Sequence, residues 1–524
     1  MLFILLFVIL LFVMIAVLDR SQKAHTIISN FPIFGRLRYF AEKLGPPIRQ
    51  YFISNNREEL PFNRSQRSWI YSSSKGVNNY EGFGTDKNIY EANFIFVNPK
   101  MFPFRVNDDH INYKSNDPYF IPCAKVIGLN KKRRKPFRPY SIVNISAMSY
   151  GSLSSQAQSA FNMGAAMVGS FHNTGEGGLS PFHQLGADVV FQLGTGYFGC
   201  GITGEDGRRY FSFEKLEELV TNKYNKVRAI EIKLSQGAKP GKGGVLPAAK
   251  NTPEIAAIRG VTPNTDVISP TYHTAFSNVR ELVDFIEQIA EKTGLPVGIK
   301  SAIGDLGEWH QLAEIMKSEN KGPDFITIDG GEGGTGAAPP SFADHVSLPW
   351  VFGFTELYQL FKNKELANDI VFIGSGKLGF PSEVMKAFAM GADMVNIARE
   401  AMLSIGCIQA QECHTDKCPT GIATQNKWLS GGLDPALKSV RFAKYINTLR
   451  KETLEMTHAC GYEHPCQVKM KDIDMSCGDN NRTVTLEQAF QYEKELVAFS
   501  SMNELFNCNY LAGLGKTPNQ LNVH

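Results

Sequence analysis

The sequence predicts an α/β fold, a (β/α)8 TIM barrel in which eight parallel strands alternate with helices. From residue 141 onward, short apolar runs end in glycine or polar clusters and alternate with helix-like segments. Eight such units occupy roughly 260 residues, the usual size of a closed barrel. The structural alternative is an open doubly wound sheet. We favour the barrel because no dinucleotide-binding fingerprint opens the first unit.

The expected strands read as nearly continuous apolar runs, as buried parallel strands do. They cover residues 141–148, 166–172, 188–192, 228–233, 296–300, 325–329, 370–374 and 394–398. Helices are expected at 154–164, 213–222, 278–293, 307–318, 353–363 and 381–390, and 193–212 reads as loop-rich. We therefore divide the chain into a transmembrane anchor (1–18), an N-terminal extension (19–140), the barrel (141–424) and a helical C-terminal extension (425–524).

The first 18 residues, MLFILLFVILLFVMIAVL, contain no charge. At 1.5 Å per residue they extend about 27 Å, close to the thickness of a bilayer core. A cleaved signal peptide is the alternative, but the run lacks a basic start and a small-residue cleavage site. Basic residues follow the run at positions 20, 23, 36, 38, 43 and 49. The positive-inside rule then predicts a single-pass protein of the inner (cytoplasmic) membrane with its catalytic domain in the cytoplasm.

The overall charge and the cysteine count exclude two classes of protein. A net charge of +3 over 524 residues is too small to predict a nucleic-acid partner. Five consecutive basic residues, 131–135, are expected to form a solvated loop, with an anionic partner as the alternative. An odd count of nine cysteines in a chain facing the cytoplasm argues against a disulfide framework.

Polar residues gather where the predicted strands end. Barrel enzymes build their sites from the loops at the carboxyl ends of the strands. The residues at these ends are Ala147, Met148, Ser149, Asn173, Thr174, Gln192, Lys233, Gln236, Lys300, Asp329, Gly374, Ser375, Gly376, Lys377 and Arg399. One glycine run is explained by a simple turn, but so many polar strand ends around one mouth indicate a binding site.

The ends of the seventh and eighth strands predict a phosphate site. Gly374, Ser375 and Gly376 offer backbone N–H groups, while Lys377 and Arg399 offer cations. Phosphates in this architecture lie after these two strands. A phosphate there, with a planar ring extending across the mouth, describes FMN.

The ring would face side chains from the other strands. Met148, Gln192, Lys233 and Lys300 all point toward this space if the barrel is closed. Lysines at the ends of the fourth and fifth strands would place positive charge beside the reduced flavin. The alternative is that Lys233 and Lys300 form ordinary buried ion pairs.

Three cysteines form one tight group shortly after the eighth strand. Cys407, Cys413 and Cys418 are separated by five and then four residues, and a proline follows the last. Such spacing suits an iron–sulfur cluster or zinc. Structural zinc sites usually need four protein ligands, and His414 is badly placed to be the fourth. Three thiolates fit a [3Fe–4S] cluster.

At this point the residues resemble a known family. The stretches NISAMSYGSLS, HNTGEGG, EIKLSQGAKPGKGG, VISPTYHT, DGGEGGTGAAP and CPTGIATQ, with the cysteine spacing, are similar to the FMN-binding synthase domain of glutamate synthase. The resemblance covers roughly residues 85–430 and is closer to short glutamate-synthase-like proteins. It implies an FMN barrel, a [3Fe–4S] cluster and reductive formation of L-glutamate from 2-oxoglutarate by way of 2-iminoglutarate. By match to the motifs, Lys300 and Gln236 lie near the 2-oxo acid, and Met148 and Ser149 lie at the flavin.

The sequence also departs from the full enzyme. It starts Met1-Leu2 rather than with the catalytic cysteine of a glutaminase domain, and it shows no NAD(P)-binding fingerprint. We therefore expect electrons from a separate donor such as a ferredoxin or a reductase. Two other functions stay open: a membrane-tethered flavin oxidoreductase acting on a different substrate, and an electron-transfer protein. The density of polar residues at the mouth argues against the second.

Overall fold

The computed structural model describes residues 1–22, 24–106, 120–222, 226–478, 482–506 and 509–512. It divides into two compact units, Met1–Trp69 and Ile70–His524.

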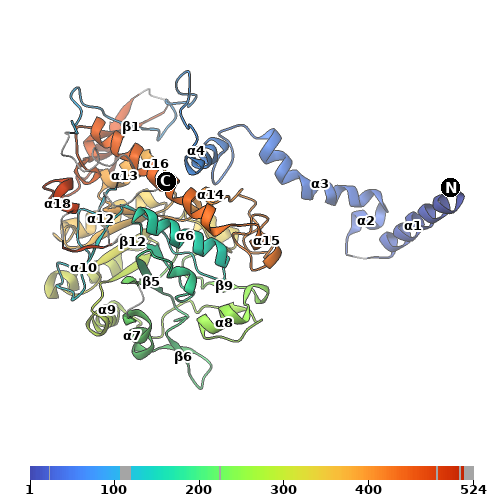
Figure 1. Cartoon of the computed structure of the whole chain (residues 1–524), viewed down its shortest axis with the longest axis horizontal. Helices are drawn as coiled ribbons and strands as arrows, with labels where there is room; N and C mark the ends of the chain where they lie inside the picture. Colours follow the sequence, from blue (N-terminus) through green and yellow to red (C-terminus); the bar gives the residue numbers. More distant parts are fainter. Residues whose placement is uncertain (23, 107–119, 223–225, 479–481, 507–508, 513–524) are drawn as a thin grey trace. The chain divides into compact units, whose positions relative to one another are not determined.

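The larger unit is built on a closed barrel of eight strands, which confirms the predicted fold (Figure 1). Every neighbouring pair of these strands is parallel. In barrel order the strands are β11 (Val297–Ser301), β12 (Phe325–Asp329), β13 (Val371–Ser375), β14 (Met394–Ile397), β3 (Val143–Ile145), β4 (His172–Asn173), β5 (Val189–Leu193) and β8 (Val227–Lys233). All of the carboxyl ends of the strands therefore meet at one mouth.

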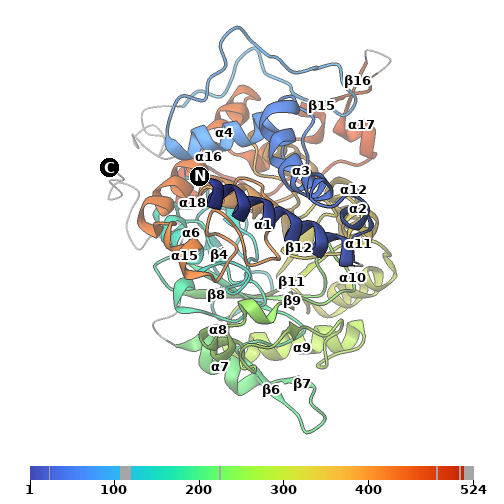
Figure 2. The same cartoon turned by 90° about the vertical axis from the view of Figure 1, so that its right-hand side faces the viewer.

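Helices surround the strands, as expected (Figures 1 and 2). They are α6 (Ser155–Val168), α7 (Phe213–Thr221), α9 (Val279–Thr293), α10 (Gly307–Glu319), α12 (Trp350–Asn363), α13 (Pro381–Met390) and α14 (Arg399–Ser404). Side-chain caps begin several of them. Ser154 accepts a hydrogen bond from the Ala157 N–H, and Asn278 accepts one from the Glu281 N–H.

The predicted second strand is largely wrong. Residues 166–168 end α6, and β4 covers only His172–Asn173. The apolar run AMVGSF has the same composition in a helix end as in a strand, so its pattern could not separate the two. Gly169 ends the helix at φ +66°, where a Cβ would meet the Tyr140 ring at 2.5 Å.

Two segments predicted as loop or helix contain strands. Residues 193–212 include the hairpin of β6 (Gly201–Thr203) and β7 (Arg209–Phe211). The C-terminal extension contains α15 (Lys427–Gly431), α16 (Pro435–Ala459), α17 (Leu486–Phe490) and α18 (Met502–Phe506), but also β15 (Ile473–Ser476) and β16 (Thr483–Thr485). These two strands form an antiparallel sheet with β1 (Ile95–Val97). This sheet pairs strands that are distant in sequence, so local patterning could not show it.

Short strands and helices are inserted between the elements of the barrel or lie outside it. β9 (Val245–Leu246), α8 (Pro253–Arg259) and β10 (Val267–Ile268) lie between β8 and α9, and α11 (Pro340–His345) follows β12. β17 (Leu511–Ala512) pairs with β2 (Arg138–Pro139). Helix α16 packs closely on α6, because a Cβ on Gly164 would lie 2.6 Å from the Ser439 carbonyl oxygen.

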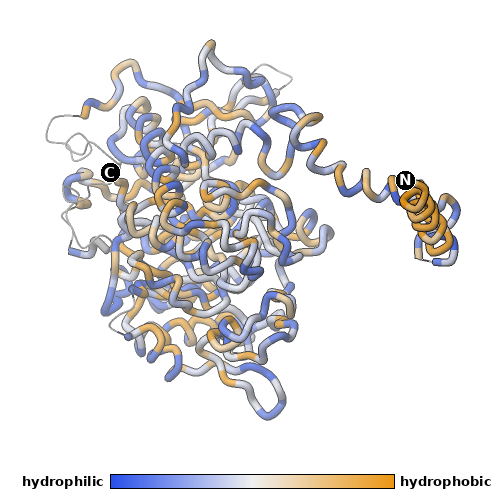
Figure 3. Tube along the Cα trace, turned by 45° about the vertical axis from the view of Figure 1, so that its right-hand side comes forward, coloured by the Kyte–Doolittle hydropathy of each residue, from blue (hydrophilic) through white to orange (hydrophobic). Residues whose placement is uncertain are grey.

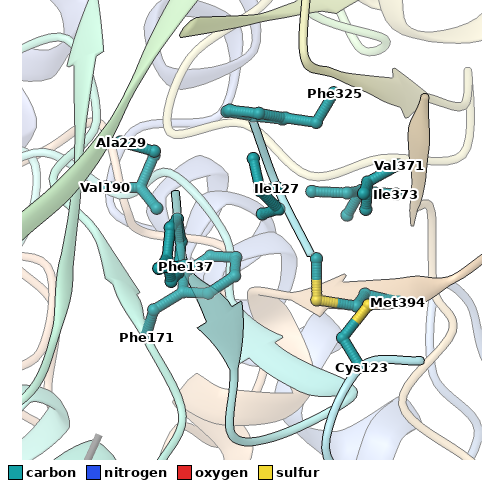
Figure 4. Close-up of a cluster of buried hydrophobic side chains, with 10 residues drawn as sticks. All are labelled: Cys123, Ile127, Phe137, Phe171, Val190, Ala229, Phe325, Val371, Ile373 and Met394. Carbon is teal, nitrogen blue, oxygen red and sulfur yellow. The ribbon is translucent and has the colours of Figure 1, made fainter. Parts of the chain in front are cut away.

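The segment 120–140 closes the amino-terminal end of the barrel. Cys123, Ile127 and Phe137 pack against residues near the start of the strands, including Ala229 and Phe325 (Figure 4). Buried ion pairs hold the same segment. Lys125 Nζ lies 3.0 Å from Asp393 Oδ2, and Arg133 binds both Glu287 and Asp324. Arg133, from the basic run 131–135, thus stabilises the fold through ion pairs. The open end of the barrel is the end where the strands have their carboxyl termini.

The smaller unit contains α1 (Leu2–Ser21), α2 (Thr26–Asn30), α3 (Phe34–Ile48), the π-helix Arg49–Ile53 and the first half of α4 (Arg64–Lys75). Among the described residues, one helix, α1, is long enough and apolar enough to cross a membrane. The mean hydropathy of its 18-residue apolar window is 3.2, and the helix appears as a hydrophobic segment in Figure 3.

Candidate functional site

The interior of the barrel is layered. Because successive side chains of a strand point to opposite faces, every second residue enters the interior. At the bottom these residues are apolar: Val190, Ala229, Phe325, Val371 and Met394. Two residues further along, Gln192, Glu231, Thr327 and Asn396 are polar, whereas β13 carries the apolar Ile373. Lys233 and Asp329 follow at the mouth. The polarity therefore increases toward the carboxyl ends of the strands.

Glu231 forms the centre of the middle layer and is only 1% exposed. Its Oε1 accepts hydrogen bonds from Asn173 Nδ2 at 2.8 Å and from Gln192 Nε2 at 2.7 Å. Its Oε2 accepts one from Thr327 Oγ1 at 2.6 Å. A buried carboxylate needs such partners, and here they come from three different strands. Asn173 and Gln192, both predicted to bind the cofactor, are therefore held in place from below.

Lys233 and Lys300 are register partners on neighbouring strands at the mouth. Lys233 Nζ lies 3.0 Å from Glu176 Oε1, and Lys300 Nζ lies 3.4 Å from Asp329 Oδ1. The ion pairs of the alternative interpretation thus exist, yet both pairs stand at the strand ends rather than in the core. Burial raises the pKa of Glu176, but the charges of Lys233, Lys239 and Arg259 outweigh it and the pKa is lowered.

Asp329 connects three strand ends. Its carboxylate accepts hydrogen bonds from Ser375 Oγ at 2.7 Å and from the Gly237 N–H at 2.8 Å, besides its pair with Lys300. Gly237 must be glycine, since a Cβ there would lie 1.9 Å from the Gly330 carbonyl oxygen. Gln236 Nε2 donates to the Gly334 carbonyl at 2.8 Å. The loops after β8 and β12 are therefore joined beside the mouth.

The predicted phosphate loop brings two cations together. Burial lowers the pKa of Lys377, and the charge of Arg399 lowers it further. Burial also lowers the pKa of Arg399, whose guanidinium donates to the Glu332 carbonyl oxygen. Glu332 and Glu400 act in the opposite direction and raise the pKa of both cations. Two neighbouring cations at the strand ends fit a phosphate.

The glycines of the same loop have a packing role as well. A Cβ on Gly374 would approach the Trp350 ring at 3.0 Å, and one on Gly376 would lie 3.1 Å from Trp350 Cβ. The tight-turn explanation thus accounts for part of this motif. Asn396, level with Ser375 on the next strand, has a buried Oδ1 that finds no partner among the described residues.

The loops after β3 and β4 hold the remaining predicted cofactor residues. Ala147, Met148 and Ser149 follow β3 and are half-buried. Gln158 Nε2 donates to the Met148 carbonyl at 2.6 Å, and Arg259 Nη2 lies 3.4 Å from Ser149 Oγ. Thr174 Oγ1 accepts from the Gln192 N–H at 3.0 Å. These hydrogen bonds link the loops to their neighbours.

The cysteine segment follows α14 in an irregular loop. Cys418 is buried, while Cys407 and Cys413 are partly exposed. Burial raises the pKa of Cys418, but hydrogen bonds from Thr420 and from the N–H groups of Ala423, Thr420 and Ile422 lower it overall. The Gln409 N–H donates to Cys407 Sγ at 3.4 Å. Donors aimed at sulfur fit thiolate ligands of an iron–sulfur cluster, whose properties depend on such bonds.

The cluster itself stays a prediction. In the described part of the chain, no group of three or more His, Cys, Asp or Glu side chains is arranged to hold a metal ion. Burial and the neighbouring Cys418 charge raise the pKa of Cys413. Without a metal, the protonated thiol of Cys413 is therefore favoured.

Lys250 joins the cysteine segment to the loop after β3. It is 2% exposed, and its ammonium donates to the carbonyl oxygens of Ser152 and Cys413, both at 3.0 Å. Burial lowers its pKa, whereas Asp416 and the cysteine sulfurs raise it. The loop after β3 includes Met148 and Ser149, so Lys250 connects two predicted cofactor sites.

The sequence reasoning missed Lys250 and Glu231. The second had a visible signal: in the strand RAIEIK, Glu231 and Lys233 share one face, so a carboxylate two residues before Lys233 must enter the barrel. Nothing local marked Lys250, because its partner Cys413 is 163 residues away.

A cavity of about 380 Å³ lies away from this mouth, between the β6–β7 hairpin, α7 and α9. Its lining includes Tyr210, Phe211, Phe285, Glu281 and Asp284. None of the strand-end residues described above lines this cavity. We therefore place the candidate site at the barrel mouth, where the polar and charged side chains gather.

Comparison with known proteins shows that the sequence is similar to glutamate synthases. Residues 98–463 match the conserved region in glutamate synthase. The glutamate synthase large subunit-like protein YerD of Bacillus subtilis is 38% identical over 89% of this chain and 92% of its own length. The archaeal glutamate synthase [NADPH] of Methanocaldococcus jannaschii is 34% identical over 70% of this chain and 67% of its own. The ferredoxin-dependent glutamate synthase of Pyropia yezoensis is 32% identical over 64% of this chain but only 21% of its own.

Proposed function

Because the chain belongs to the glutamate synthase family, we propose that it is an FMN- and [3Fe–4S]-dependent oxidoreductase. It forms L-glutamate from 2-oxoglutarate by way of 2-iminoglutarate, and it takes electrons from a separate donor such as a ferredoxin or a reductase. The observation that carries the proposal is the charged mouth, where Lys233 and Lys300 stand side by side above the buried Glu231 network.

FMN fits the mouth at both of its ends. Lys377 and Arg399 would hold the phosphate, and Gln192, Asn173 and Met148 would contact the ring. Bound there, FMN supplies hydride transfer to carbon. The hydrogen bonds of Asn173 and Gln192 to Glu231 fix both amides before the cofactor arrives, which lowers the cost of ordering them.

Lys300 and Gln236 would hold the substrate. Lys300 Nζ is a fixed cation at the mouth, oriented by Asp329, and it can pair with a carboxylate of a 2-oxo acid. Gln236 Oε1 lies 3.3 Å from Lys233 Nζ, so both side chains face the same space. Lys233 Nζ lies 3.0 Å from Glu176 Oε1. This pair can hold a proton close to an imine nitrogen.

The cysteine segment would hold the cluster, with Cys407, Cys413 and Cys418 as ligands. The N–H donors around Cys418 and the buried ammonium of Lys250 stabilise negative charge there. The loop that carries them contacts the loop of Met148 and Ser149 through Lys250. A one-electron centre at this position would connect an external donor with the flavin.

One reaction tests the function. The purified full chain is reduced anaerobically, and flavin absorbance is followed after adding 2-oxoglutarate with and without ammonium. We expect reoxidation only with both, together with one glutamate per flavin by mass spectrometry. Reoxidation that needs neither compound would contradict the proposal. Reoxidation by another acceptor would favour the alternative of a different substrate.

A variant pair locates the substrate. Lys300→Met should raise KM for 2-oxoglutarate by roughly 10–150-fold, because a charge-assisted contact contributes about 1.5–3 kcal/mol. Flavin content, measured separately, should stay close to that of the parent. Lys317→Met is the control, since Lys317 pairs with Glu365 on the exposed surface of the barrel. An unchanged KM in Lys300→Met would remove this residue from the substrate site.

Helix α1 would anchor the protein in the inner (cytoplasmic) membrane, with the barrel in the cytoplasm. Its length and the mean hydropathy of 3.2 over 18 residues support the anchor, and so do the basic residues that follow it. Deleting residues 1–20 should release the protein from membranes in high salt with its flavin bound. Recovery of the truncated chain in the high-salt membrane pellet would show that another surface anchors it.

A further inference from the structure

Helix α3 carries an apolar stripe that faces solvent. Phe34, Leu37, Phe40, Leu44 and Ile48 are 74%, 61%, 61%, 38% and 44% exposed. Their spacing of three or four residues puts them on one side of the helix, within an arc of about 120° at 100° per residue. An exposed apolar patch of this kind indicates an interaction surface.

The opposite side of α3 is basic. Arg36, Arg38 and Lys43 against Glu42 give this helix a net charge of 3 − 1 = +2, and Arg49 follows directly. An apolar stripe bordered by basic side chains is the pattern of helices that lie in the plane of a membrane surface. The same pattern matches anionic lipid headgroups, which attract basic segments next to a membrane.

The start of α3 is fixed at the end of α1. The Asp19 carboxylate, at the last turn of α1, accepts from Arg36 Nε at 2.9 Å and from the Ile33 N–H at 2.9 Å. Gln22 closes the turn between them, since its side chain accepts from the His25 N–H at 2.8 Å. Helix α2 packs tightly on α3, because a Cβ on Gly35 would meet the Ile27 carbonyl oxygen at 2.8 Å. Helix α3 thus begins where α1 would leave the bilayer.

We infer that α3 lies in the interface of an anionic phospholipid bilayer, with Phe34, Leu37, Phe40, Leu44 and Ile48 among the acyl chains. The inference rests on the proposed anchor, which supplies the membrane. Lipid satisfies both sides of the helix at once. The acyl boundary covers the apolar stripe, and the headgroups attract Arg38, Lys43 and Arg49, while Arg36 holds Asp19. The helix then holds the start of the following chain at the membrane surface. With α1 alone, the chain after α1 would be free to rotate about the anchor.

Photo-crosslinking in the full chain tests the inference. Benzoylphenylalanine is placed at Phe40 on the stripe, at Glu42 on the opposite side as the matched control, and at Phe7 within α1. Each protein is reconstituted in vesicles of phosphatidylcholine and phosphatidylglycerol, irradiated and analysed by mass spectrometry. We expect lipid adducts at positions 7 and 40, and at least fivefold fewer at 42.

The three positions separate the possible failures. Lipid adducts at 7, with position 40 joined to residues 70–524 or to a second chain, would overturn the interfacial helix while the anchor stands. Lipid adducts at 40 without any at 7 would support the helix and refute the anchor. Absence of lipid at both positions would refute both. Vesicles of phosphatidylcholine alone should lower the yield at 40 by about twofold or more, since the basic side loses its partners. An equal yield would refute the preference for anionic lipid.

Discussion

The Glu231 network allows a quantitative test of the site. Its carboxylate accepts three hydrogen bonds inside the barrel, from Asn173, Gln192 and Thr327. Glu231→Gln keeps the shape but removes the charge. A hydrogen bond to a charged group contributes about 1.5–3 kcal/mol and a neutral one about 0.5–1.5. Each bond therefore loses about 1 kcal/mol, and the three together lose about 3 kcal/mol.

The loss should appear in both stability and flavin binding. For a large domain, 1 kcal/mol shifts the melting temperature by about 2–4 °C, so we expect a fall of about 6–12 °C. Asn173 and Gln192 would also lose their fixed orientation, and the FMN dissociation constant should rise about tenfold or more. Thermal melting and fluorescence titration of the released flavin measure the two effects.

Glu287→Gln is the matched control. Glu287 also accepts three hydrogen bonds, two from Arg133 and one from the Gly322 N–H, but at the closed end of the barrel. Its side chain is 26% exposed, so its loss of stability should be smaller. Its flavin affinity should not change. Equal FMN dissociation constants for the two variants would refute the link between Glu231 and the cofactor site.

Three further predictions concern the other parts of the chain. Cys413→Ser should remove the iron and the broad visible absorption of the cluster while FMN stays largely bound, whereas Cys477→Ser, an exposed cysteine, should change neither; equal iron in both variants would refute the cluster. Lys377→Met should weaken FMN binding by roughly 10–150-fold with little change in melting temperature, and Arg399→Ala should weaken it less; an unchanged FMN dissociation constant in Lys377→Met would mean that this loop is only a tight turn and not a phosphate site. His273, held at a pKa of about 4 mainly by burial, is neutral in the folded state but takes up a proton near pH 6.5 when unfolded. Stability should therefore fall as the pH drops from about 6.5 to 4, by up to about 3 kcal/mol for this residue, and melting of His273→Gln should depend less on pH in that range.

Packing against Trp350 limits what a substitution of Gly376 can show about the phosphate site. A valine at this position would crowd Trp350 before it met any ligand, since the added Cβ alone lies 3.1 Å from Trp350 Cβ. Gly376→Val should lower stability and flavin occupancy together. It cannot separate a phosphate site from a tight turn, and the Lys377→Met variant can.

Local patterns predicted most of the barrel. The strand expected at 325–329 is β12 (Phe325–Asp329), and the helix expected at 381–390 is α13 (Pro381–Met390). Both have one clear period and end at glycine, proline or a charged residue. The second strand failed where the run AMVGSF offered two periods at once, and the β1–β15–β16 sheet failed because its pairing joins distant segments.

In the candidate site, too, some features could be predicted from local patterns and others could not. Positions at strand ends could be predicted, because a closed barrel brings all of its carboxyl ends together whatever the loops do. The partners of those positions could not. Glu176 reaches Lys233 across 57 residues, and Gln236 reaches the Gly334 carbonyl across 98 residues. Loops set these contacts, and no periodic pattern encodes them.

The two ends of the barrel explain why so many charges are tolerated at its mouth. At the closed end, Cys123, Ile127 and Phe137 fill the interior, and the ion pairs of Lys125 and Arg133 tie the covering segment to the strands. That end contributes stability that does not depend on a ligand. The mouth can therefore keep like charges such as Lys377 and Arg399 close together, although Arg399 lowers the pKa of Lys377. A bound anion would add a partner of opposite charge for both cations, and it follows that flavin binding should stabilise the mouth more than the closed end.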